Sequence, residues 1–170
     1  MAGNEFLFPR LAKLVRRMYE DNLGANRHGS FDEHDLLVGC FAWIIAPDDI
    51  TGGLGVAAGY SHSIDHLLGG RLDSFDIENP DNLRKVAATP EEVECRLREL
   101  LAASEELSRN DQEKVVQAVL RHEGTNEEID LLPHSLLAQT LVEADRLANM
   151  TTTILMRGAR FSLHLPLVDS

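Results

Sequence analysis

Hydrophobic residues recur at helical spacing along most of this chain, and no stretch of useful length alternates between apolar and polar positions. In the segment 6–19, for example, Leu11, Leu14, Val15 and Met18 fall on one face of a helix. The same periodicity predicts six helices, over residues 6–19, 32–46, 56–68, 90–106, 111–121 and 133–149. The pattern therefore predicts an all-α fold, a single-domain bundle of five to seven helices spanning residues 1–170.

Residues that commonly begin and end helices agree with this pattern. Thr89, Pro90 and Glu92 have the order of a capping box, and Ser108 or Asn110 can cap the following helix. The inner face of the second predicted helix consists of Leu36, Leu37, Cys40, Phe41 and Ile44.

The segment 51–59 is rich in glycine and overlaps the start of the third predicted helix. No Gly-Lys-Ser/Thr sequence follows it and no strand precedes it, so a phosphate-binding loop is not favoured. We expect either a flexible joint or a close crossing of two helices.

The composition is that of a globular domain, with 44% hydrophobic and 26% charged residues among 170. Cys40 and Cys95 lie in apolar helical patterns without a Cys-x-x-Cys motif, which favours buried free thiols over a disulfide or a nucleophile. The first residues lack a signal-peptide pattern, and the longest apolar run, 38–46, is too short to span a bilayer. We therefore expect a cytoplasmic protein with no membrane partner.

The net charge of −12 changes the list of expected partners. A field of this sign repels phosphate backbones, so no nucleic-acid partner is expected. A small phosphorylated molecule remains compatible with it if a metal ion or an arginine cluster supplies local positive charge. The sequence leaves open whether the chain forms a homo-oligomer.

The placement of histidines points to metal chemistry. His34 opens the second predicted helix, His62 and His66 are four residues apart on the third, and His122 ends the fifth. Two histidines at this spacing can reach one divalent ion. Asp145 lies in an apolar helix, where a carboxylate needs a metal ion or a salt bridge. The candidate partners of such a salt bridge are Arg121, Arg146 and Arg157.

These residues, in this order, resemble the HD superfamily, whose members are all-helical, metal-dependent phosphohydrolases. The resemblance is carried by the segments 34–38, 56–68, 119–122 and 143–147, and it covers about residues 31–160. Its strongest piece is the sequence Ala-Asp-Arg-Leu at residues 144–147.

The chain departs from the family's pattern at one position. The signature aspartate should directly follow His62, and Ser63 stands there instead. Asp65 or His66 could take over the role of the missing residue. The dipeptide His34–Asp35 is a rival for the signature His-Asp pair, but it follows the polar run 27–33 rather than an apolar helix.

The resemblance implies a metal site formed by His34, His62, Asp145 and either Asp65 or His66. Mixed imidazole and carboxylate ligands suit manganese, iron, zinc, cobalt or nickel better than calcium. Asp65 is also the candidate for the catalytic role that the resemblance implies for the missing aspartate.

His122 is the second implied catalytic residue, since it could stabilise phosphate charge or donate a proton to the leaving group. The arginines implied to hold phosphate oxygens are Arg121, Arg146 and Arg157.

Three functions are compatible with this sequence. The first is hydrolysis of a nucleotide or another small phosphate ester. The second is a binding or regulatory role for a catalytically degenerate HD-like domain, which Ser63 suggests. The third is a two-iron, oxygenase-like protein, in which His66 and His122 would both have to join the site.

Overall fold

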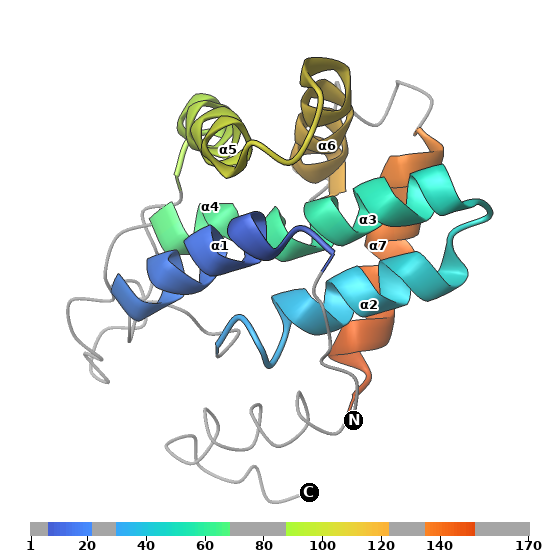
Figure 1. Ribbon diagram of the computed structural model, residues 1–170. Helices are drawn as coiled ribbons and strands as arrows, with labels where there is room; N and C mark the ends of the chain where they lie inside the picture. Colours follow the sequence, from blue (N-terminus) through green and yellow to red (C-terminus); the bar gives the residue numbers. More distant parts are fainter. Residues whose placement is uncertain (1–6, 22–29, 69–87, 123–134, 152–170) are drawn as a thin grey trace, which may run out of the picture.

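The computed structural model describes residues 7–21, 30–68, 88–122 and 135–151, and within these ranges every regular element is an α-helix (Figure 1). This confirms the predicted all-α helical bundle. The helices are α1 (Pro9–Asp21), α2 (Asp35–Ile45), α3 (Asp49–Ser61), α4 (Ile64–Leu68), α5 (Pro90–Ser104), α6 (Arg109–His122) and α7 (Leu136–Asn149).

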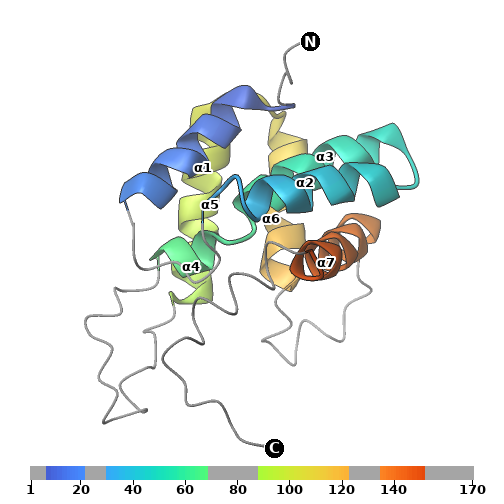
Figure 2. The ribbon, with the colours of Figure 1, turned by 90° about the horizontal axis from the view of Figure 1, so that it is seen from below.

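Helix α3 is the centre of the bundle. It packs against α1, α2, α6 and α7, and its partner in the most extensive helix pair is α2 (Figures 1 and 2). Helix α7 covers both α2 and α3, while α5 joins α1 and α4 to α6. Helices α2, α6 and α7 therefore all contact α3.

The glycine-rich segment is part of this central helix rather than a joint before it. Helix α3 begins at Asp49, seven residues earlier than predicted, and Asp48 caps it by accepting a hydrogen bond from the Thr51 amide. Nearly every residue from Gly52 to Ser61 is buried. Glycine is unfavourable inside a helix, but here it allows close contact with neighbouring helices on several sides.

The close helix crossing that the glycines suggested is present between α2 and α3. A Cβ atom on Gly59 would lie 2.5 Å from the backbone nitrogen of Gly39, and one on Gly55 would lie 3.0 Å from the Cβ of Ala42. The inner face of α2 is therefore formed by small residues and Val38. The predicted inner face is wrong in detail, because Cys40 and Ile44 are exposed.

Capping groups define most helix ends. The predicted capping box at Thr89 and Glu92 is confirmed, and the Ser108 hydroxyl accepts a hydrogen bond from the Asp111 amide at the start of α6. Helix α7 is capped by Ser135. The first two residues of the predicted final helix, 133–134, and residue 6 of the predicted first helix lie outside the described residues.

Helix α1 is capped from a distant part of the chain. Its first amides, those of Arg10 and Leu11, donate hydrogen bonds of 3.0 and 2.9 Å to the carboxylate of Glu106, just after α5. A carboxylate at this position also interacts favourably with the positive end of the helix dipole.

Both cysteines are free but exposed, so the prediction of buried thiols is wrong. No helix in the described part of the chain has both the length and the apolar character needed to cross a membrane.

Candidate metal centre

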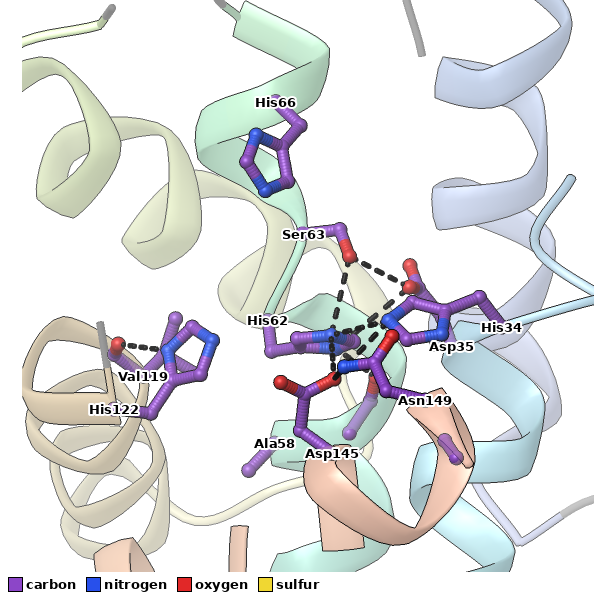
Figure 3. Close-up of polar contacts among 12 residues, drawn as sticks. His34, Asp35, Ala58, His62, Ser63, His66, Val119, His122, Asp145 and Asn149 are labelled. Atoms are coloured by element: carbon purple, nitrogen blue, oxygen red, sulfur yellow. Dashed lines mark hydrogen bonds and ion pairs between the residues drawn. The ribbon is translucent and has the colours of Figure 1, made fainter. Parts of the chain in front are cut away.

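Polar side chains from three parts of the bundle meet at the end of α3 (Figure 3). His34 and Asp35 are the N-cap and first residue of α2, and His62 and Ser63 occupy the break between α3 and α4. Asp145 reaches the same place from α7. The structure therefore brings together His34, His62 and Asp145, which the sequence singled out as metal ligands.

The atoms that could bind a cation lie close together. Nε2 of His34 is 3.2 Å from Nε2 of His62 and 3.2 Å from Oδ1 of Asp145. Nε2 of His62 lies 3.6 Å from the same carboxylate oxygen. With metal–ligand bonds of about 2.1 Å, two ligands lie about 3.0 Å apart in octahedral geometry and about 3.4 Å apart in tetrahedral geometry. The three donor atoms are thus spaced as ligands of a single ion.

The orientation of His62 suits this role. Its Nδ1 lies 2.8 Å from the carbonyl oxygen of Gly59, one turn earlier in α3, so Nδ1–H donates to that carbonyl. This leaves Nε2 directed at His34 and Asp145. A backbone carbonyl that holds the other ring nitrogen is the usual support of a metal-binding histidine.

Asp35 adds a second carboxylate, and it is completely buried. Its Oδ1 accepts a hydrogen bond of 2.8 Å from the Ser63 hydroxyl and lies 3.6 Å from Nδ1 of His62. Burial raises its pKa, although His62 and His34 act in the opposite direction. Among the described residues, the buried group of His34, Asp35 and His62 could hold a metal ion, since each offers a donor atom within 4.8 Å of the others.

The electrostatics of the group favour a positive charge at its centre. Burial by itself would lower the pKa of His62, but Asp35 and Asp145 outweigh it and raise that pKa to about 9. Burial would raise the pKa of Asp145, but hydrogen bonds with His34 and His62 hold it well below its usual range. A proton on His62 therefore offsets part of the negative charge of the carboxylates in the metal-free protein, at the place where a cation would fit.

His122, at the end of α6, lies beside this group. Its ring is edge-on to that of His62 with centroids 5.2 Å apart, and its Nδ1–H donates to the Val119 carbonyl at 2.8 Å. Burial and the neighbouring His62 lower the pKa of His122 to about 4. The ring is therefore neutral at pH 7, so the expectation that it donates a proton to a leaving group does not fit the metal-free protein.

Asp65 and His66 pair with each other in α4. Oδ2 of Asp65 lies 3.2 Å from Nδ1 of His66, and Figure 3 shows the His66 ring apart from the other labelled histidines. The reason is the break at residues 62–63, because α4 begins only at Ile64. Residues three or four positions beyond His62 therefore do not share its face, as they would in a continuous helix.

The arginines expected to bind phosphate are not at the group either. Arg146 is exposed and pairs with Glu143 at 2.7 Å, while no described hydrogen bond or ion pair connects Arg121 with the group. Arg157 lies outside the described residues. The carboxylate of Asp145 accepts instead from Asn149, at 3.1 Å, besides its two histidine contacts. Neither Arg121 nor Arg146 forms the salt bridge considered for Asp145.

Asp35 is the residue that the sequence did not identify as a ligand. The dipeptide His34–Asp35 is a rival for the signature pair, but it follows the polar run 27–33 rather than an apolar helix, which argues against that role. The local sequence does not decide whether this acidic residue, which directly precedes the apolar stretch 36–46, is buried or exposed.

Comparisons with known proteins give no further assignment: no protein-family model, no curated protein and no solved structure matches this chain.

Proposed function

We propose that this chain is a metal-dependent phosphohydrolase of the HD type, acting on a nucleotide or another small phosphate ester. The proposal rests mainly on one observation. Two imidazole nitrogens and one carboxylate oxygen, from α2, the α3–α4 break and α7, lie 3.2–3.6 Å from one another. The order of His34, His62 and Asp145 along the chain is also the order that resembles the HD superfamily.

Three protein ligands would leave coordination positions open for water and substrate. A bound divalent ion would lower the pKa of a water molecule and polarise a phosphoryl oxygen. Mixed nitrogen and oxygen donors favour manganese, iron, cobalt, nickel or zinc over calcium. The ion would also supply the positive charge that an acidic protein needs in order to bind a phosphate.

The roles of the surrounding groups follow from their hydrogen bonds. The Gly59 carbonyl keeps Nε2 of His62 available as a ligand, and Asn149 orients the carboxylate of Asp145. His122, neutral and with Nδ1–H held by Val119, has Nε2 available to accept a hydrogen bond. We assign it to orienting water or substrate rather than to donating a proton.

The test combines metal analysis with an activity assay on chain purified without a histidine tag. We expect about one transition-metal ion per chain, and hydrolysis of small phosphate esters that stops when a chelator is added. Asp145→Asn should lose both metal and activity, whereas Glu143→Gln, on the exposed face of the same helix, should keep both. If the wild-type chain binds no metal ion, the proposal is wrong.

One observation favours the alternative, a catalytically degenerate domain with a binding or regulatory role. His34 and Asp35 have no exposed surface and His62 is only 4% exposed, so Asp145, at 26%, is the part of the group that solvent reaches. This burial limits access for a substrate. Ser63 also stands in place of the expected aspartate. Bound metal without hydrolysis of any ester in the assay would support this alternative.

The two-iron, oxygenase-like function has less support, because it needs His66 as a ligand. His66 pairs with Asp65 instead.

A further inference from the structure

Asp35 is the only acidic residue that is fully buried among the residues the structure describes. It begins α2, where the helix dipole favours a negative charge. Its Oδ2 is buried and accepts no hydrogen bond of normal geometry from a described residue, although Tyr19 is close enough to lower the pKa of the carboxyl group. A buried carboxylate with so few partners is unfavourable unless a cation compensates it.

The carboxylate of Asp35 lies next to the side chain of Ser63, the residue after His62. The Ser63 hydroxyl donates to Oδ1 of Asp35 at 2.8 Å and lies 3.2 Å from Nε2 of His62. That nitrogen is the one directed at His34 and Asp145. Ser63 thus connects the carboxylate of Asp35 with Nε2 of His62, a proposed ligand atom.

We propose that Asp35 is the second carboxylate ligand of the metal ion, and that Ser63 is the positioning residue that holds it. This inference rests on the metal centre of the proposed function, but not on hydrolysis. Asp35 would supply the carboxylate that the HD superfamily has at the position of Ser63.

Distance and charge both support this assignment. Donor atoms of His34, Asp35 and His62 lie within 4.8 Å of one another, an upper bound slightly larger than the distance of about 4.2 Å between two ligands on opposite sides of an ion. The charges of two carboxylates, with two neutral imidazoles, would balance that of a divalent ion. A neutral complex is far less costly to bury than one that carries net charge.

The competing explanation is that Asp35 is only a structural acceptor for Ser63. The two roles predict opposite effects of Asp35→Asn, which keeps the shape of the side chain and removes its charge. A ligand role predicts loss of metal binding, whatever the effect on the stability of the metal-free protein, in which Asp35 also faces the protonated His62. A structural role predicts lower stability and unchanged metal affinity.

The experiment measures Mn²⁺ binding by calorimetry and metal-free melting by circular dichroism, on the full untagged chain. We expect Asp35→Asn to weaken Mn²⁺ binding about 100-fold, and Ser63→Ala about tenfold, as for groups that orient ligands. The double variant Asp35→Ser, Ser63→Asp moves the carboxylate to the other side chain and should bind Mn²⁺ within about tenfold of the wild type. The visible spectrum of bound Co²⁺ should change in Ser63→Ala if the serine positions a ligand.

The control is Asp49→Asn. Asp49 is likewise the first residue of its helix, but it is exposed, so its replacement should leave Mn²⁺ binding unchanged.

Each outcome decides the proposal. If Asp35→Asn binds Mn²⁺ like the wild type while Asp145→Asn does not, this inference is wrong and the metal centre of the proposed function stands. If Asp145→Asn also binds normally, or the wild type binds no Mn²⁺, both fail. If Asp35→Asn does not fold, the double variant decides, because its recovery of binding supports the proposal and its failure to bind when folded overturns it.

Discussion

The crossing of α2 and α3 places His34 next to His62, and Gly59 is the residue that allows the two helices to approach. A Cβ atom at this position would lie 2.5, 2.7 and 2.9 Å from three backbone atoms of Val38 and Gly39, where ordinary contacts are 3.4–4 Å. Backbone atoms cannot move aside as a flexible side chain can. Gly59→Ala must therefore separate the helices by roughly 1 Å.

The expected cost is worked from these contacts. Overpacking of this kind costs about 1–3 kcal/mol or more, and the higher helix propensity of alanine offsets about 1 kcal/mol. Because the clash is with backbone, we expect a net loss of about 2 kcal/mol, which lowers the melting temperature by about 4–8 °C in a chain of this size.

A matched control lies on the same helix. A Cβ atom on Gly53 would meet only the Leu7 side chain, at 4.0 Å. Gly53→Ala should therefore raise stability by about 1 kcal/mol through helix propensity alone. The two variants make the same chemical change in α3 and differ only in what the added methyl group meets.

The same pair of variants tests the link between packing and the metal centre. Gly59 is three residues before His62, and its carbonyl oxygen accepts the Nδ1–H hydrogen bond. Separating the helices should pull His62 from His34 and weaken Mn²⁺ binding in Gly59→Ala but not in Gly53→Ala. Thermal melts by circular dichroism, with and without Mn²⁺, measure both effects. A Gly59→Ala variant that melts at or above the wild-type temperature would refute this reasoning.

Three further predictions concern charge. Asp145→Asn should weaken Mn²⁺ binding at least 100-fold and Asp65→Asn less than tenfold, since only the first contacts both histidines; equal losses by calorimetry would contradict this. The pKa of His62, about 9 in the folded protein, exceeds its usual 6.5. The metal-free chain should therefore lose stability from pH 6.5 to 9, as this proton is lost. Over the same range the rise in melting temperature caused by Mn²⁺ should grow, because the metal ion and the proton compete for His62. A Mn²⁺ effect that does not depend on pH would contradict this competition. Glu106→Gln should cost about 1 kcal/mol by weakening the cap of α1, and an unchanged urea midpoint would show that the cap is unimportant.

The helical fold was predictable from the sequence because its signals are local. An apolar period near 3.6 and a capping box such as the one at Thr89 act over a few neighbouring residues. The identity of three candidate ligands was also predictable. Asp145 stands out because a carboxylate is unusual in an apolar helix. His34 and His62 stand out because their order along the chain resembles a known metal-binding pattern. The structure brings donor atoms of all three within 3.6 Å of one another.

Other features depended on contacts that periodicity does not encode. The inner face of α2 is formed by small residues because α3 approaches closely, so Cys40 is exposed where a hydrophobic pattern favoured burial. The helix break at residues 62–63 separates His66 from His62, although their spacing suits a continuous helix.

Asp35 shows the difference most clearly. The sequence places an acidic residue at a helix start, where exposed and buried carboxylates are equally compatible with the local pattern. Only the packing of α2 against the α3–α4 break puts it beside Ser63 and His62. Local sequence thus determined which segments are helical, whereas the tertiary structure decided which polar side chains share one buried space, because that depends on helices far apart in the chain.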